Sequence, residues 1–344
     1  MRTRRCSIGG NVLFFVSGVF LAFLNSAEPS DSQTSPDLIA SLEPSTLPLK
    51  HFDTITFSGT DMFIMAYRPI RGVSPRVETT LTVFRADGTS HTLDVDNELW
   101  SCVMPSEDIL YTLEVAHSRS PSDSPERAFL VREYNLKSGN ARSLVQPQSE
   151  AIEAIHLYGN TLYLIGRGYD SAGGDILTIR TLPPGGGDRT SSYSVSTMQI
   201  GPPKTVRIGK YRPFGGALYC FVTSDPSRPG GTFYRLDFGS QEFVKVLEVP
   251  SMLDFCIVSD GPRLAYLHDD STDPSEPSYA LTLVPLDGKA EKPVTANLDR
   301  GKSRFGEGLQ YDPNDRAFIV KGSLPPHDAR SRSYYHIRVS KFSK

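Results

Sequence analysis

The feature that most constrains the fold is a strand–turn–strand unit that recurs along the chain. Two short apolar segments joined by a tight polar turn are found at Thr54–Phe57 with Met62–Tyr67, and again at Ile155–Tyr158 with Thr161–Ile165. Further copies pair Phe255–Val258 with Leu264–Leu267, Gly308–Tyr311 with Ala317–Val320, Leu99–Met104 with Ile109–Val115, and Val206–Tyr211 with Ala217–Val222. Self-similarity at a fixed period is the signature of a repeat architecture.

Each unit is followed by a polar connection and a third strand, and in the first five copies by a fourth strand. The clearest hairpin joins Thr80–Arg85 to Ser90–Val95 through Asp87-Gly88, a dipeptide that strongly favours a hairpin between alternating apolar segments. A repeat of about 50 residues with about four strands has the size of a propeller blade. Six copies fit between residues 50 and 344, so the sequence predicts an all-β fold, a six-bladed β-propeller of four-stranded blades. The 28 glycines and 26 prolines suit a chain with this many turns.

The sixth copy is shorter than the others, because Tyr334–Phe342 is its third strand and the sequence ends at Lys344. An unpaired third strand would leave an open edge. The apolar segment Asp37–Leu42 belongs to no repeat. We therefore expect this segment, within the N-terminal region 28–49, to supply the missing strand and close the ring.

One part of the sequence resembles a known superfamily. Ile257–Tyr266, which contains Val258-Ser259-Asp260-Gly261, is followed by Tyr279–Leu283 and Pro285–Lys289, and together these segments look like a WD40-like blade of the TolB type. The resemblance implies a periplasmic or extracellular propeller that binds partners, and it carries over no catalytic residue.

The N-terminus is typical of a secretory signal peptide. Arg2, Arg4 and Arg5 precede an apolar run from Val12 to Leu24, and the small residues Asn25-Ser26-Ala27 follow it. The run is short for a stable membrane anchor. We expect cleavage after Ala27, export to the periplasm or outside the cell, and no membrane span in the mature chain; a buried helix or a retained anchor is the alternative.

Charge and cysteine usage limit the function classes. Removing residues 1–27 takes away three arginines and no acid, which changes the formal net charge from −3 to −6 and gives no electrostatic basis for binding nucleic acid. The mature chain keeps Cys102, Cys220 and Cys256, each within an apolar strand. Buried free thiols are one interpretation. A disulfide between Cys220 and Cys256 is the other.

The predicted binding face follows from the geometry of the blades. The turns after the first and third strands are tight, whereas the second-to-third connections are long, and in an up-and-down blade these long connections gather on one side of the ring. Long loops on a rigid scaffold commonly carry binding sites. Residues that flank these loops or begin the innermost strands form the predicted ligand site: Asp53, Arg68, Trp100, His117, Arg167, Arg207, Asp225, Asp254, His268 and Lys321.

The sequence contains no familiar catalytic or cofactor motif. Gly-x-Ser-x-Gly does not occur, and Gly185-Gly186-Gly187 has no following Lys-Ser/Thr, so it indicates a turn and not a phosphate loop. The acidic loop Asp269–Glu276 is the best candidate for calcium, but it lacks EF-hand spacing and favours a solvated loop. We predict neither cofactor nor metal. The first hypothesis is a propeller that binds a protein, peptide or glycan. The alternative is a hydrolase or lyase with carboxylates such as Asp53, Asp225 and Asp254 at the channel mouth.

Overall fold

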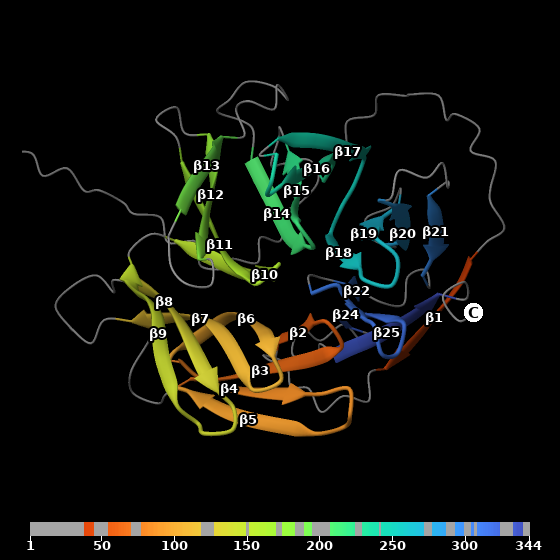
Figure 1. Cartoon of the computed structure of the whole chain (residues 1–344). Coiled ribbons are helices and arrows are strands. Elements are labelled where there is room, and N and C mark those ends of the chain that lie inside the picture. Colours follow the sequence, from red (N-terminus) through yellow and green to blue (C-terminus); the bar gives the residue numbers. More distant parts are fainter. Residues whose placement is uncertain are drawn as a thin grey trace, which may run out of the picture. The chain divides into compact units, whose positions relative to one another are not determined.

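The computed structural model describes residues 38–44, 54–69, 77–117, 127–148, 151–169, 174–182, 189–194, 207–223, 229–240, 242–271, 277–286, 293–298, 304–305, 308–323 and 333–339. Every regular element within these ranges is a β-strand. The strands form small antiparallel sheets in sequence order, so the predicted all-β propeller is confirmed (Figure 1).

The first three blades are separate four-stranded sheets, each built from consecutive strands. Blade 1 consists of β2 (Thr54–Ser58), β3 (Asp61–Pro69), β4 (Val77–Phe84) and β5 (Ser90–Val95). Blade 2 consists of β6 (Glu98–Ser106), β7 (Ile109–His117), β8 (Arg127–Asn135) and β9 (Ala141–Gln148). Blade 3 consists of β10 (Ile152–Tyr158), β11 (Thr161–Tyr169), β12 (Asp175–Leu182) and β13 (Arg189–Ser194).

The last three blades follow the same plan with one irregularity. Blade 4 consists of β14 (Arg207–Phe214), β15 (Ala217–Thr223), β16 (Gly231–Asp237) and β17 (Phe243–Val249). Blade 5 consists of β18 (Asp254–Val258), β19 (Arg263–Asp269), β20 (Tyr279–Pro285) and β21 (Val294–Asn297). In blade 6 the innermost strand is split into β22 (Arg304–Phe305) and β23 (Gln310–Asp312), and both pair with β24 (Ala317–Ser323), which pairs with β25 (Ser333–Val339).

The predicted closing strand is present. β1 (Leu38–Pro44) pairs antiparallel with β25, with Ala40 opposite Val339 and Pro44 opposite Tyr335. Its first residues also pair in parallel with β21, so β1 links the outer edges of blades 5 and 6 (Figure 1). The open edge expected for an incomplete last blade is therefore covered.

The hydrophobic core lies between blades. The described residues contain six apolar clusters, and each joins two neighbouring blades, including one in which Ile55 of blade 1 meets Ile319 of blade 6. Both faces of a blade are thus buried, which explains why β15 is buried along its whole length. The clusters complete a ring of six blades.

The three described cysteines are free and buried, so the interpretation as buried thiols is confirmed and the Cys220–Cys256 disulfide is wrong. Burial raises the pKa of all three thiols, because the charged thiolate loses solvation. No helix that could cross a membrane is found in the part of the chain that the structure describes. The expected signal peptide, residues 1–27, lies outside that part.

Candidate functional site

On one side of the ring the innermost strand of each blade begins and the second strand ends. We call this side the long-loop face, because the second-to-third connections lie there. Most of their length is outside the described residues, at 70–76, 118–126, 170–173, 224–228, 272–276 and 324–332. The structure therefore describes the rim formed by the strand ends.

An exposed tyrosine stands at this rim, where blades 3 and 4 meet. Tyr169 ends β11 and is 65 % exposed, the highest value among the large apolar side chains that the structure describes. The Arg207 guanidinium, at the start of β14, lies 5.8 Å from the centre of the Tyr169 ring, close enough for a cation–π contact. We call this pair the Tyr169–Arg207 shelf.

A buried carboxylate holds the shelf in place. Arg207 Nη1 lies 3.3 Å from Asp175 Oδ1, and Asp175 Oδ2 accepts a hydrogen bond of 2.7 Å from the backbone N–H of Ile208. The Asp175 side chain is 2 % exposed. A buried charge must be paired to be tolerated, so Asp175 fixes Arg207, and Arg207 braces the exposed ring.

A second ion pair lies beside the shelf. Arg167 Nη2 donates to Glu153 Oε2 at 3.1 Å, and Arg167 Nη1 donates to the carbonyl of Ile208 at 2.8 Å. The Tyr211 hydroxyl donates to the same Glu153 oxygen at 3.0 Å. Burial and the neighbouring Glu153 charge raise the pKa of Tyr211 well above its ordinary value, so this hydroxyl stays protonated and acts as a donor.

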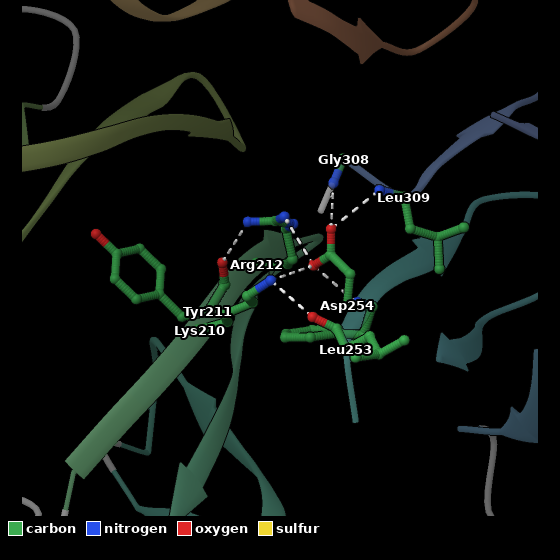
Figure 2. A network of polar contacts seen from close by, with 8 residues as sticks. Lys210, Tyr211, Arg212, Leu253, Asp254, Gly308 and Leu309 are labelled. Carbon is green, nitrogen blue, oxygen red and sulfur yellow. Dashed lines mark hydrogen bonds and ion pairs between the residues drawn. The ribbon is translucent and has the colours of Figure 1, made fainter. Parts of the chain in front are cut away.

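A third set of hydrogen bonds and ion pairs, after those of Asp175 and Glu153, centres on Asp254, the first residue of β18 (Figure 2). Its Oδ2 accepts hydrogen bonds from the backbone N–H groups of Gly308 at 2.6 Å and Leu309 at 2.9 Å, where the innermost strand of blade 6 is interrupted. Its Oδ1 accepts from its neighbour's backbone N–H, that of Phe255, at 2.9 Å. Lys210 Nζ and Arg212 Nη2, both on β14, lie 3.3 and 3.4 Å from the same oxygen. Asp254 thereby joins blades 4, 5 and 6.

These contacts decide what Asp254 can do chemically. A carboxylate has about four lone-pair positions, and five donors already approach this one. The side chain is fully buried. Asp254 is therefore placed to hold the blades together. Asp53 and Asp225, the other two carboxylates named for the alternative hydrolase or lyase, lie outside the described residues.

Three of the predicted site residues lie in neighbouring blades and take part in these three groups of contacts: Arg167 in blade 3, Arg207 in blade 4 and Asp254 in blade 5. His268 lies in blade 5 and is buried, with Nδ1 2.7 Å from Asp270 Oδ1 and Nε2 2.9 Å from Thr282 Oγ1. Both of its ring nitrogens are thus engaged within its own blade.

The other predicted site residues lie elsewhere. Trp100 is half-buried and packs edge-on against Phe129, with ring centres 5.4 Å apart, in the core between blades 2 and 3. Arg68 is exposed at the end of β3, and Lys321 is half-buried on β24. His117 ends β7, where its backbone pairs with that of Arg127. Asp53 and Asp225 lie outside the described residues.

Sequence reasoning missed Tyr169, Asp175, Lys210 and Arg212. The sequence did contain a signal for Lys210 and Arg212. Together with Arg207 they place three positive charges on a strand expected to be innermost. Charged residues are unusual at buried strand positions and point to paired or functional groups. Tyr169 had no comparable signal, since tyrosine in a strand is ordinary.

Within the described ranges, no group of three or more His, Cys, Asp and Glu side chains could hold a metal ion. In the acidic loop, Asp269 Oδ1 accepts hydrogen bonds from the backbone N–H groups of Ser271 and Ser278 at 2.9 and 3.1 Å, so this carboxylate closes the base of the loop. Residues 272–276 lie outside the described part.

No family model matches the chain, and no curated protein matches it. The TolB-type resemblance therefore stays a prediction. Among solved structures, the chain is similar to YjhT, with 10 % identity, a TM-score of 0.49, and coverage of 86 % of this chain and 98 % of that one. A subtype N10 neuraminidase-like protein of A/little yellow-shouldered bat/Guatemala/060/2010 shares 10 % identity at a TM-score of 0.47, covering 87 % of this chain and 98 % of that one. Trypanosoma rangeli sialidase shares 12 % identity at a TM-score of 0.49, covering 88 % of this chain and 55 % of that one.

Proposed function

We propose that this chain is an exported binding protein that recognises a protein, peptide or glycan partner at the rim between blades 3 and 4 of its long-loop face. Export rests on the basic start, apolar run and small residues of the N-terminal segment. The Tyr169–Arg207 shelf is the observation that supports the binding site. An aromatic ring that is 65 % exposed has no packing reason to be held in one place, yet Arg207 and the buried Asp175 hold it.

The composition of the shelf favours recognition. Tyrosine and arginine are among the residue types that contribute most to binding energy at interfaces. A side chain that is already fixed loses less conformational entropy when a partner binds, so a braced ring binds more tightly than a mobile one. A tyrosine ring also offers a flat apolar face with a polar end, which suits both peptides and sugars.

The test is a screen of the purified protein against a peptide display library and a glycan array, followed by the same ligands on variants. Tyr169→Ala and Arg207→Gln should each weaken the binding of the selected ligands by about tenfold or more, which corresponds to about 1.4 kcal/mol. The matched control is Tyr158→Ala, because Tyr158 is also exposed, at 49 %, but ends β10 on the opposite side of the ring. Ligands that bind Tyr169→Ala and wild type equally would refute the proposed site.

A further inference from the structure

The strand β14 carries an unusual set of cations for an innermost propeller strand. Arg207, Lys210 and Arg212 all lie on it, and Arg167 from β11 donates to its backbone at Ile208. Arg207 and Arg212 lie opposite Thr223 and Tyr219 of β15, four ladder positions apart, because β14 has a bulge between Ile208 and Lys210. At a strand rise of about 3.3 Å their backbones are therefore about 13 Å apart, and positive charge runs along β14 from Arg207 to Arg212.

The acceptors near these cations are already occupied. Asp175 and Asp254 are buried, and backbone N–H groups take part of their hydrogen-bonding capacity. Glu153 accepts from both Arg167 and Tyr211. The cationic side chains keep part of their surface in solvent, with 19 % of Lys210 and about a third of Arg207 and Arg212 exposed. Four cations, Arg167, Arg207, Lys210 and Arg212, thus face three carboxylates, Glu153, Asp175 and Asp254, so this described group carries a net positive charge of one with part of its cationic surface in solvent.

We infer that the partner of the proposed site is an acidic peptide segment, which lies along β14 with its carboxylates toward Arg207, Lys210 and Arg212. This inference rests on the proposed function and adds the chemistry of its ligand. Carboxylates are pure acceptors and match the fork of guanidinium donors. A peptide of about five extended residues has the length of the cationic strand. An acidic glycan fits less well, because each sugar ring adds several hydroxyl donors, whereas each peptide residue adds one backbone N–H.

The experiment uses the mature chain and fluorescein-labelled pentapeptides with amidated C-termini. Pentaglutamate should bind, and pentaglutamine, which has nearly the same shape without charge, should bind at least about tenfold more weakly. Raising the salt from about 0.05 M to about 0.5 M should weaken pentaglutamate binding, because exposed charges are screened. This comparison changes only the peptide and the salt, so it does not depend on how any variant folds.

Protein variants then locate the site. Arg207→Gln and Lys210→Gln should each lower the affinity for pentaglutamate by about tenfold. Arg142→Gln is the charge-matched control, because Arg142 lies on the outer strand β9 and pairs with Glu133 there. A melting temperature close to that of wild type shows that each variant is folded.

Equal affinity for the two peptides, or tighter binding of a galacturonate pentasaccharide than of pentaglutamate, would overturn the inference. The proposed function would survive that result if the ligands found in the library screen still depended on Tyr169. The proposed function itself would be refuted if the ligands found in the library screen bound Tyr169→Ala as tightly as wild type.

Discussion

The side chain of Asp254, on the innermost strand of blade 5, accepts a hydrogen bond of 2.6 Å from the backbone N–H of Gly308 in blade 6. Removing this carboxylate would leave backbone N–H groups and the cations Lys210 and Arg212 without their central acceptor. We expect Asp254→Ala to lower the free energy of unfolding by about 3–5 kcal/mol, the usual cost of breaking a buried ion pair.

Denaturant unfolding of the purified protein measures this effect. Asp94→Ala is the control, since Asp94 is exposed on the outer strand β5, where it accepts a hydrogen bond of 2.9 Å from the Thr80 hydroxyl; we expect a change within about 0.5 kcal/mol. Equal stability of the two variants would contradict the role assigned to Asp254.

Two glycines on β11 should respond differently to alanine. A Cβ atom at Gly166 would lie 2.3 Å from the backbone oxygen of Ala151, whereas a Cβ at Gly168 would have no neighbour within 4 Å. Because backbone cannot move aside cheaply, Gly166→Ala should destabilise the fold by about 1–3 kcal/mol. Gly168→Ala should leave the melting temperature nearly unchanged, and a similar loss in both variants would be inconsistent with this close approach.

The closing strand should be essential for stability. Five residue pairs join β1 to β25, and each net backbone hydrogen bond contributes about 0.5–1.5 kcal/mol. A chain lacking residues 28–45 should therefore melt at a lower temperature and aggregate through the uncovered edge of β25, as followed by calorimetry and light scattering. A chain lacking only 28–36, which keeps the strand, serves as the control. Unchanged melting and solubility of the longer deletion would show that ring closure does not depend on β1.

His156 should make the stability depend on pH. Burial lowers its pKa, although the ring donates from Nε2 to the carbonyl of Gly215 at 2.8 Å. In the unfolded chain the pKa is near its ordinary value of about 6.5, so the unfolded state binds the proton more readily. The contribution of neutral His156 is therefore fully present above about pH 6.5 and is lost as the pH falls through the lower pKa of the folded state.

Unfolding free energies measured at several pH values test this assignment. His156→Gln can still donate to Gly215 but does not titrate, so its stability should fall less than that of wild type between about pH 7 and pH 5. His91→Gln is a control for a histidine on the outer strand β5. Parallel curves for wild type and His156→Gln would exclude His156 as the source of the pH dependence.

The sequence by itself determined the architecture. Alternating apolar strands, tight turns such as Asp87-Gly88 and a period of about 50 residues are local patterns, and they are sufficient to predict six blades. The need to pair the last strand predicted the role of β1, even though its partner β25 is almost 300 residues away. The burial of Cys102, Cys220 and Cys256 also followed from their apolar strands.

The tertiary structure alone decided the chemistry of the site. Arg207 meets Asp175 from 32 residues away, and Gly308 meets Asp254 from 54 residues away, each across a boundary between blades. Those meetings depend on how each blade packs against the next, which strand periodicity does not encode. For the same reason Trp100, expected at the channel mouth, packs against Phe129 in a core, whereas Tyr169, an ordinary strand residue in the sequence, stands exposed beside Arg207.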